Sequence, residues 1–408
     1  MKITFLTENI HCGGLDSFLI SLVNHWPYPE DELRIICNPA HPGYQVLKDR
    51  IIRPCEVVRH DISTYPVLVS KSNRNRFLRT ARRVLSPLLR YGYFVYYLIR
   101  LRSIFAKWQT DRLMVVNGGH PGGDTCRAAV IAWRLFHEDK PRAIYNFHNL
   151  ANMPNRIDRL PEKLMDSWLV SNARALVGVS KICAESLRKR IGDTAMNKVS
   201  YIYNGIAEPV ESANLGTSLR EELGIPAGVP LCLMLATYEP RKGHDFLFRA
   251  FQKVIAAIPN AHLVVCGYGY PEEVERVRHL IELYDLSRHV NLQGFRSDVD
   301  AMLKQADVLL VASQIFESFG LTSVEAMANR VPVVATRVGG VPEVVADGEG
   351  GFCVGPDDVQ GYANHIIAFL KESDFRKEQA KKGYQRYRRL FSAERMAKEY
   401  AMLVHREC

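Results

Sequence analysis

The sequence predicts an α/β protein with two Rossmann-like domains, each built on a doubly wound parallel sheet. Short apolar runs alternate with polar loops and helical stretches in both halves of the chain. This alternation is typical of parallel strands joined by helices that cover both faces of a sheet. A chain of 408 residues is long enough for two domains of ordinary size.

The first half of the chain predicts one such domain. It begins with a buried strand at Lys2–Thr7, a Gly13-Gly14 turn and an amphipathic helix. A strand, glycine turn and helix can bring backbone amides to a ligand, although a tight turn that needs positive φ would explain the glycines equally well. Further strands are expected at Leu33–Cys37, Leu113–Asn117, Ala143–Phe147 and Ala175–Ser180.

A domain boundary is predicted after Val199–Gly205, which we interpret as a last strand. The stretch that follows, IAEPVESANLGTS, contains Pro, Ser and Asn without an apolar period. The second half then repeats the pattern, with helices after Gly243 and from Pro271. Its strands are expected at Leu231–Thr237, His262–Cys266, Val290–Gln293, Val308–Ala312 and Val331–Thr336. A ligand site is expected in the cleft between two such units.

Composition indicates which classes of protein the sequence fits. The chain is 47% hydrophobic and 24% charged, which indicates a globular protein. No run of eighteen apolar residues occurs, so no membrane-spanning helix is expected, and the first residues lack the features of a signal peptide. Nine cysteines without a C-x-x-C motif suit reduced thiols better than disulfides or zinc. These features predict a cytoplasmic protein.

The net charge of +9 is concentrated in one region. Between Ile62 and Thr110 there are ten basic residues and no Asp or Glu. Within Arg74–Trp108, aromatic and apolar residues accompany the arginines, which suits an interfacial helix on an anionic membrane. A core-packing helix pair with a solvated basic face explains this region equally well. Nucleic-acid binding is disfavoured because the aromatics cluster and no nucleic-acid motif is present.

The stretch from Phe316 to Ala346 carries the strongest functional pattern. Glu317 and Glu325 flank a run of small and hydroxylated residues that is expected to enter a helix. If Phe319, Gly320, Leu321 and Thr322 form its first turn, their N–H groups would hold a diphosphate without a metal. Each carboxylate could then accept hydrogen bonds from a pair of sugar hydroxyls. The alternative is an acidic, capped helix on a solvated face.

This stretch resembles the E-x7-E signature of retaining glycosyltransferases of the GT-B fold, most closely family 4. The match comprises Glu317, Ser318, Phe319, Gly320, Glu325, Ala326 and the GG-x-PE of Gly339, Gly340, Pro342 and Glu343. The resemblance implies that Glu317 faces the transferred sugar and Glu325 the ribose. It also implies two domains facing across a cleft, with a terminal helix that crosses back to the first. We therefore predict an N-terminal acceptor-side domain, 1–207, completed by a helix at about 386–408, and a nucleotide-sugar domain, 208–385.

The same resemblance implies further site residues. Gly13 and Gly14 would lie against the diphosphate or acceptor, and Gly267, Gly294 and Phe295 near the nucleotide. His148 follows a strand-like segment at the carboxyl edge of a parallel sheet, where ligands bind, and in the family a histidine here contacts the sugar. His120, on a glycine-rich loop, is a weaker candidate for the acceptor side.

Arg241 and Lys242 stand between a strand and a helix, where they could neutralise phosphate charge. Lys242 and Gly243 match a lysine-glycine pair of the family, whereas the arginine expected upstream falls at Ala236. The sequence leaves open whether Arg241 compensates for Ala236. Asp298 and Asp300 imitate a metal-binding D-x-D motif, but we interpret Asp298 as the N-cap of an acidic first helical turn. No metal and no other cofactor is expected.

The resulting hypothesis is a retaining hexosyltransferase. The donor would be a UDP- or GDP-linked sugar, and the acceptor hydroxyl would belong to a lipid-linked or cell-surface glycan precursor of the polysaccharide or lipopolysaccharide type, reached from the inner face of the cell membrane. Alternatives are a GT-B epimerase or hydrolase, and a non-catalytic membrane or nucleic-acid binding protein. The sequence does not determine the base, the sugar, the acceptor, the linkage position or the oligomeric state.

Overall fold

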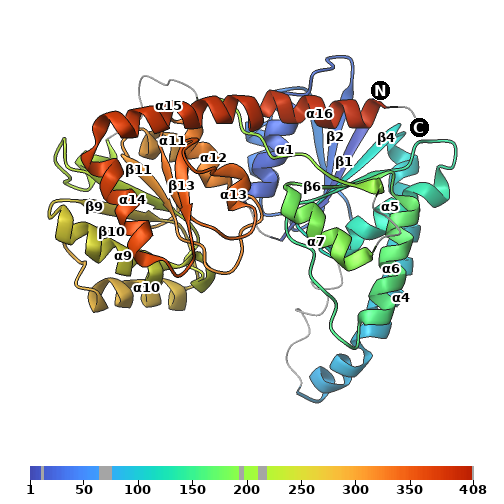
Figure 1. Cartoon of the computed structure of the whole chain (residues 1–408). Coiled ribbons are helices and arrows are strands. Elements are labelled where there is room, and N and C mark those ends of the chain that lie inside the picture. The colour runs from blue at the N-terminus through green and yellow to red at the C-terminus, as the bar shows by residue number, and fades with distance from the viewer. Residues whose placement is uncertain (11–12, 64–75, 193–196, 210–217, 407–408) are drawn as a thin grey trace. The chain divides into compact units, whose positions relative to one another are not determined.

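The structure is a computed structural model that describes residues 1–10, 13–63, 76–192, 197–209 and 218–406 (Figure 1). Side chains of 76–89 and of residue 91 are outside this description. The chain forms two compact units, which are described separately below. The first comprises Met1–Gly205 with Ala393–Cys408, and the second comprises Ile206–Ser392.

The described residues of the first unit form a seven-stranded sheet in the order β3-β2-β1-β4-β5-β6-β7. Every neighbouring pair is parallel, with Ile3 of β1 opposite Leu33 on one side and Arg112 on the other. The order reverses between β1 and β4, which is the arrangement of a doubly wound sheet. The strands are β1 Lys2–Glu8, β2 Glu32–Cys37, β3 Cys55–Arg59, β4 Arg112–Asn117, β5 Ile144–Phe147, β6 Ala175–Gly178 and β7 Val199–Tyr201.

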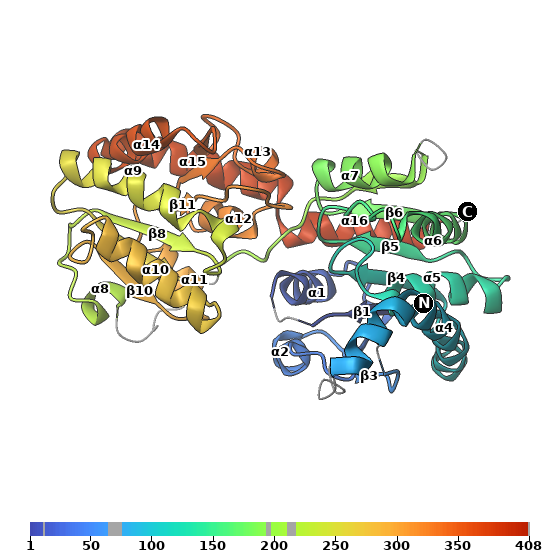
Figure 2. The ribbon, with the colours of Figure 1, turned by 90° about the horizontal axis from the view of Figure 1, so that it is seen from below.

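Helices cover both faces of this sheet (Figure 2). On one face, α1, α2 and α16 share a hydrophobic core with the strands. On the other, α5 packs against β1 and β4 and contacts α4 and α6. The helices are α1 Gly14–Asn24, α2 Tyr44–Arg50, α4 Arg76–Trp108, α5 Asp124–Phe136, α6 Arg159–Asn172, α7 Lys181–Ile191 and α16 Ala393–His405.

The C-terminal helix α16 belongs to the first unit. Met396, Tyr400 and Val404 are buried in its core, and the Tyr400 hydroxyl accepts a hydrogen bond of 2.7 Å from the Asn146 side chain. These residues recur at helical spacing, so one face of α16 is apolar. The expectation that the last helix packs on the first domain is confirmed.

The basic stretch was predicted to form either an interfacial helix or a packed pair of helices. Its described residues form one helix, α4. Phe94, Tyr97, Leu101 and Phe105 are buried. Arg90 binds Asp124 and Glu162, Arg100 pairs with Asp61, and Arg102 lies over the Phe136 ring. The described half of α4 therefore packs against the rest of the first unit, and its arginines contact residues of that unit. The apolar row at Phe77, Ala81, Val84, Leu85 and Leu88 is outside the described side chains, so a lipid-facing surface there stays a prediction.

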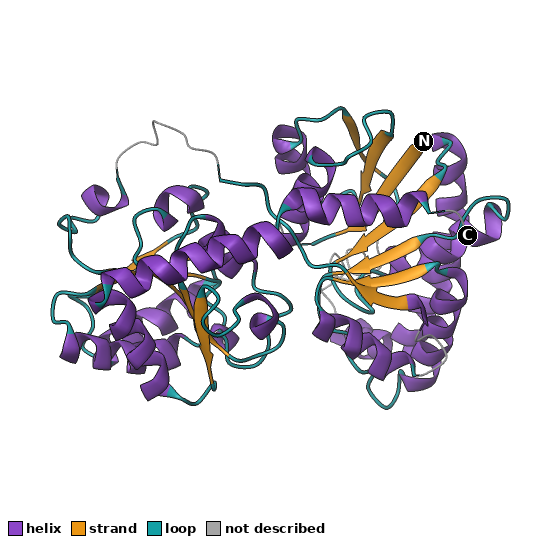
Figure 3. Cartoon of the chain, turned by 45° about the horizontal axis from the view of Figure 1, so that its top comes forward, coloured by secondary structure: helices purple, strands orange, loops and turns teal. Residues whose placement is uncertain are grey.

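The described residues of the second unit form a six-stranded parallel sheet in the order β10-β9-β8-β11-β12-β13. Figure 3 shows its strands with helices on both sides. The strands are β8 Leu231–Leu235, β9 His262–Cys266, β10 Val290–Gln293, β11 Val308–Val311, β12 Val333–Thr336 and β13 Gly351–Val354. The helices are α8 Leu219–Glu222, α9 His244–Ala257, α10 Pro271–Leu283, α11 Val299–Leu303, α12 Leu321–Ala328, α13 Val341–Val344, α14 Val359–Lys371 and α15 Ser373–Leu390.

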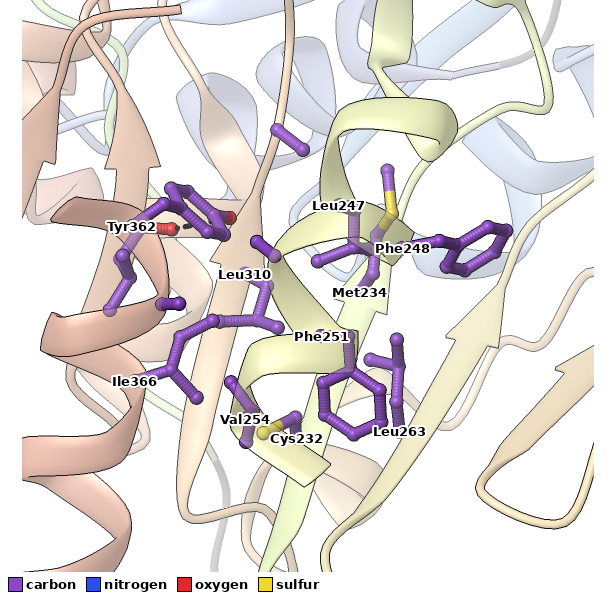
Figure 4. Close-up of a cluster of buried hydrophobic side chains, with 14 of the residues drawn as sticks. Cys232, Met234, Leu247, Phe248, Phe251, Val254, Leu263, Leu310, Tyr362 and Ile366 are labelled. Atoms are coloured by element: carbon purple, nitrogen blue, oxygen red, sulfur yellow. Dashed lines mark hydrogen bonds between the residues drawn. The ribbon is translucent and has the colours of Figure 1, made fainter. Parts of the chain in front are cut away.

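The core of this unit lies between the sheet and helices α9 and α14 (Figure 4). Leu247, Phe251 and Val254 of α9 are fully buried, as is Ile366 of α14. Tyr362 of α14 is also buried, and its hydroxyl donates to the Val334 carbonyl at 3.1 Å. This packing fixes the strands whose carboxyl ends carry the polar loops described next.

Two strands were not predicted, β3 and β13. Both lie at sheet edges. β3 has only partly buried and exposed residues, and β13 is four residues long and begins at Gly351. The weak hydrophobic pattern of β3 is typical of an edge strand, whereas β13 is mostly buried but follows the glycine-rich run at 348–351, which is typical of a loop. Among the described residues, no helix has the length and apolar character needed to cross a membrane.

Candidate active site

Two loops of the second unit, one after β11 and one after β12, pack together through their backbones. The Gly340 N–H donates to the Glu317 carbonyl at 2.7 Å. A Cβ on Gly339 would lie 2.1 Å from that carbonyl oxygen, and one on Gly340 would lie 2.4 Å from the Ser318 oxygen. Gly339 also has φ of 52°. Only glycine allows this approach, so the glycine pair fixes the backbone that carries Glu317.

The Glu317 carboxylate has two polar partners at this place. Lys242 Nζ donates to Glu317 Oε2 at 2.5 Å, and Ser313 Oγ donates to the same oxygen at 3.2 Å. The side chains of Lys242 and Glu317 are 15% and 19% exposed, so solvent reaches both. Lys242 and Glu317 were predicted from the sequence, but Ser313 was not, because its only signal is its position just after β11.

Lys242 ends a short 3-10 helix, Pro240–Lys242, between β8 and α9. Gly243 follows with φ of 75°, and a Cβ there would lie 1.9 Å from the Ala312 carbonyl oxygen. The Gln314 N–H donates to the Arg241 carbonyl at 2.8 Å. Because β8 and β11 are neighbours in the sheet, these contacts hold the lysine beside the glutamate.

Helix α12 begins next to Glu317. Its N-cap is Gly320, with φ of 94°, and no side chain caps this end. Thr322 and Ser323 lie inside the first turn of α12, and neither side chain caps it. The first N–H groups of a helix have no intrahelical partner, so those of Leu321 and Thr322 can serve an anion. Glu325 lies one turn further along α12 and is partly buried.

Phe319 does not present its side chain to this surface. It is 3% exposed, and its ring packs edge-on against Phe391 at 5.7 Å between centroids. Phe319 therefore anchors the loop, while any contact with a ligand would come from its backbone.

Arg241, next to Lys242, is held by a neighbouring carboxylate. Its Nε and Nη2 donate to Glu239 at 2.6 and 3.1 Å, and its guanidinium lies 5.2 Å from the Phe316 ring centroid. Thr237 also donates to Glu239, at 2.8 Å. Burial opposes ionisation of Glu239, but these hydrogen bonds outweigh it and lower the pKa of its carboxyl group. Arg241 is thus paired within its own loop.

Ala236 lies at the end of β8, packed against the next strand. Its N–H donates to the Cys266 carbonyl at 3.0 Å, and a Cβ on Gly267 would lie 1.8 Å from the Ala236 oxygen. Strand packing therefore requires a glycine at 267. Neither Ala236 nor Thr237 supplies a positive charge.

Exposed aromatic residues gather where β9 and β10 end. Phe295, after Gly294, is 72% exposed, and Tyr268, after Gly267, is 51% exposed. Their rings lie edge to face with centroids 6.2 Å apart. No Cβ contact restricts Gly294. This end of the sheet offers aromatic surface and open backbone at one place.

Asp298 is the N-cap residue of α11, and Arg296 binds it through two hydrogen bonds of 2.9 and 2.7 Å. Asp300 accepts a hydrogen bond from Asn329 at 2.8 Å. Within the described parts of the chain, no group of three or more His, Cys, Asp or Glu residues could hold a metal ion.

In the first unit, the Gly13 N–H donates to Asp16 Oδ2 at 2.9 Å, and Asp16 Oδ1 lies 2.8 Å from His41 Nε2. Gly13 has φ of 166°, which is extended backbone, so positive φ does not explain this glycine. Gly14 is the first residue of α1. The buried pair of Asp16 and His41 holds the turn in place.

His148 follows β5, and its N–H donates to the Asn117 carbonyl at 3.0 Å. Its ring lies edge-on to Phe18, with centroids 4.5 Å apart. Burial lowers the pKa of this imidazole to about 3, so it is neutral near pH 7. Its buried Nε2 makes no hydrogen bond to any described residue.

His120 does not line a ligand surface. It is 1% exposed, with Nε2 2.9 Å from Asp166 and Nδ1 3.4 Å from the Tyr145 hydroxyl. Burial lowers the pKa of its imidazole, against the opposing effect of Asp166. Asp166 also binds Arg190, which binds Glu162, so His120 belongs to a buried ionic network. The weaker candidate of the sequence analysis is therefore structural.

Both halves of the chain match models of known protein families. Residues 217–386 match the family described as glycosyl transferases group 1, and residues 57–208 match glycosyltransferase family 4. The chain belongs to the family 4, group 1 glycosyltransferases. In this family member, the matched segment 217–386 contains Lys242, Glu317 and Glu325.

Curated relatives of this family member match over part of their length. The chain is 28% identical over 207 residues to N-acetyl-alpha-D-glucosaminyl L-malate synthase of Bacillus anthracis, covering 51% of this chain and 53% of the relative. It is 30% identical over 262 residues to D-inositol 3-phosphate glycosyltransferase of Corynebacterium glutamicum, covering 60% and 62%. The chain thus spans between half and two thirds of these relatives.

Solved structures match along the whole chain. A glycosyltransferase from Rickettsia africae has a TM-score of 0.77 at 19% identity, covering 100% of this chain and 99% of its own. Anabaena Alr3699/HepE in complex with UDP has a TM-score of 0.73 at 20% identity, covering 99% of both. With the two parallel sheets, these similarities establish the GT-B fold for this family member.

Proposed function

We propose that the protein is a retaining glycosyltransferase that moves a hexose-type sugar from a UDP- or GDP-linked donor to an acceptor hydroxyl. The observation that carries this proposal is the pair of Lys242 and Glu317, held 2.5 Å apart and solvent-accessible beside the uncapped start of α12. A cation, a carboxylate and free backbone N–H groups together suit a ligand that has both phosphates and sugar hydroxyls.

In the proposed reaction, the departing diphosphate gains negative charge. Lys242 and the N–H groups of Leu321 and Thr322 would stabilise it, because groups fixed before the reaction need little rearrangement. Once Lys242 turns to phosphate, the Glu317 carboxylate is available for hydroxyls of the sugar. Glu325 would bind the ribose hydroxyls in the same way.

Two features distinguish the proposed donor site of this chain. Ala236 and Thr237 supply no charge, and Arg241 is bound to Glu239. Lys242 would therefore be the main side-chain cation for the diphosphate. With Lys242 and backbone N–H groups as partners for the phosphates, we propose that transfer needs no metal and no other cofactor.

In the first unit, we propose that the neutral imidazole of His148 contacts the transferred sugar, because its Nε2 is without a hydrogen bond among the described residues. The Gly13-Gly14 turn would contact the diphosphate or the acceptor. In the second unit, the backbone near Gly267, Gly294 and Phe295 would bind the base, with Tyr268 and Phe295 as aromatic neighbours. Retention would follow from attack on the face that the diphosphate leaves, with that diphosphate accepting the proton.

Similar proteins suggest the substrate classes. A solved neighbour, Anabaena Alr3699/HepE, was crystallised with UDP-glucose, at 19% identity. A relative from Rhizobium meliloti is a lipopolysaccharide core biosynthesis glycosyltransferase, 29% identical over 185 residues. We accordingly propose a nucleotide-sugar donor and a glycan or lipid-linked acceptor, used in the cytoplasm at the inner face of the membrane.

The direct test is a panel of UDP- and GDP-sugars offered with hexose, inositol phosphate and lipid-linked acceptors. We expect one donor to release its nucleoside diphosphate only when an acceptor is present. Nuclear magnetic resonance coupling constants of the product should show the donor's anomeric configuration. Free sugar formed without acceptor would indicate a hydrolase, an altered nucleotide sugar would indicate an epimerase, and an inverted product would contradict retention.

A further inference from the structure

The outer face of α6 exposes large apolar side chains in a row. Leu160, Leu164 and Trp168 are spaced four residues apart and are 69%, 60% and 54% exposed. Ile157, just before the helix, is 82% exposed. Residues four apart share one side of a helix. We call Ile157, Leu160, Leu164 and Trp168 the α6 apolar face.

The acidic and the basic residues of α6 lie on different sides of the helix. Its acids point inward, since Glu162 binds Arg127 and Arg190, and Asp166 binds Arg190 and His120. Both acids are at most 5% exposed.

Its cations point outward. Arg159 and Lys163 of α6, and Arg156 just before the helix, are exposed, and none of the three has an ion-pair partner among the residues that the structure describes. The nearby Asp158 is partly buried and accepts a hydrogen bond from Asn155 at 2.7 Å. The exposed surface of this helix is therefore apolar and positive, without the acids that soluble helices usually carry outside.

We propose that the α6 apolar face docks on an anionic membrane surface, with Leu164 and Trp168 entering the headgroup region and Arg159 and Lys163 binding lipid phosphates. Tryptophan favours the boundary between water and lipid, and basic side chains beside it are attracted to anionic headgroups. This inference goes beyond sugar transfer and does not depend on it.

One other occupant of this face, and one other membrane-binding surface, fit less well. A second copy of the chain, paired through the same face, would bring two sets of basic residues into one interface without exposed acids of α6 to balance them, and like charges repel. The described half of α4 is a weaker lipid surface, because its Arg90 and Arg100 are already paired with acids of the same unit. The membrane prediction for the part of the basic stretch whose side chains are not described stays separate from this proposal for α6.

The first test is flotation of the full chain with vesicles of phosphatidylcholine alone and with about one third phosphatidylglycerol. We expect binding to the anionic vesicles only. Leu164→Asp should weaken it about tenfold or more, since it removes apolar burial and adds a like charge. Lys163→Gln should weaken it about fivefold, the value of one basic residue at a charged surface. Ile52→Asp is the matched control, because Ile52 is 85% exposed in the same unit and the charge change is the same.

The second test identifies the helix that touches lipid. Of the chain's four tryptophans, Trp26 and Trp133 are 3% and 0% exposed, Trp108 is at the end of α4, and Trp168 is on α6. Brominated anionic lipid should quench fluorescence in the wild type and in Trp108→Phe, and most of this quenching should disappear in Trp168→Phe.

Three results would overturn the proposal: loss of quenching in Trp108→Phe instead, equal binding of Leu164→Asp and Ile52→Asp, or a concentration-dependent dimer that Leu164→Asp abolishes. Because none of these measurements uses a sugar donor, their failure leaves the proposed transfer reaction untouched. A chain that docks on vesicles but transfers no sugar would contradict the proposed function alone.

Discussion

The loop after β4 in the first unit and the loop after β11 in the second occupy equivalent places in their sheets, since each follows the strand next to the point where strand order reverses. Both loops contain glycine and potentially catalytic polar residues. In the first, His120 is 1% exposed and bound to Asp166. In the second, the Glu317 side chain is 19% exposed and bound to Lys242. Each loop carries a side chain in a charged pair, but the residue in the first loop is buried and the pair in the second is partly exposed.

This difference separates a structural role from a ligand-binding role. A buried charge must keep its protein partner, because removing it leaves an uncompensated charge in a medium of low polarity. A partly exposed pair can exchange its partner for a ligand at little cost. We therefore propose that the network around His120 and Arg127 stabilises the first unit, and that Lys242 and Glu317 bind a ligand.

The largest expected effect is on the stability of the first unit. Arg127→Met should lower its free energy of unfolding by about 3–5 kcal/mol, because Glu162 and Asp124 lose a buried partner. Arg278→Met, which breaks an exposed pair with Glu275, should cost at most about 1 kcal/mol. Urea unfolding measures both. A cost below about 1 kcal/mol for Arg127→Met would show that the network is not structural.

Lys242→Ala should lower the transfer rate by about 10²–10³-fold, as expected when one stabilising group for developing charge is removed. Its free energy of unfolding should change by at most about 1 kcal/mol, because the pair is partly exposed. Arg278→Ala again serves as the control, since it removes one positive charge from the same unit. If both variants keep the wild-type rate, the result would contradict the proposed ligand-binding role of Lys242.

Two glycine substitutions isolate the contact beneath Glu317. Gly339 and Gly348 have φ of 52° and 77°, so alanine costs about 1 kcal/mol of backbone strain at either site. A Cβ at Gly348 has no neighbour within 4 Å, whereas one at Gly339 would meet the Glu317 carbonyl. Gly339→Ala should therefore be the less stable variant, and it alone should slow transfer. Equal stabilities and rates would mean that the glycine pair does not position Glu317.

The smallest expected effect concerns pH and His244, which follows Lys242 and Gly243 in the sequence but is fully buried. Burial, with Arg276 and Lys242 nearby, lowers the pKa of this imidazole from 6.5 to about 3. Between these values the unfolded state binds more protons, so stability is fully present above pH 6.5 and is lost as pH falls towards 3. The slope is at most about 1.4 kcal/mol per pH unit for one histidine. Urea titrations at several pH values should show a smaller slope in His244→Leu, and an unchanged slope would place His244 in solvent.

The sequence predicted the central strands of the second unit because each is a short, mostly apolar run, as at Val308–Val311. It missed Cys55–Arg59, whose residues are only partly buried or exposed at a sheet edge, and Gly351–Val354, which begins in a glycine-rich run typical of a loop. It found Lys242 and Glu317 through a motif. It could not assign His120, since its partner Asp166 is 46 residues away in the chain and brought near only by folding. The exposed row on α6 escaped notice because helical spacing alone does not tell which side faces solvent.

We propose above that Lys242 and Glu317 bind the diphosphate and the sugar of an activated donor. Calorimetric titration of the whole chain with UDP and GDP tests it most directly, with Lys242→Ala and Arg278→Ala measured alongside. We expect one nucleotide to bind the wild type and Arg278→Ala equally, and Lys242→Ala at least about tenfold more weakly, as for loss of a charge-assisted contact. Binding of neither nucleotide, or equal affinity in all three proteins, would contradict the account.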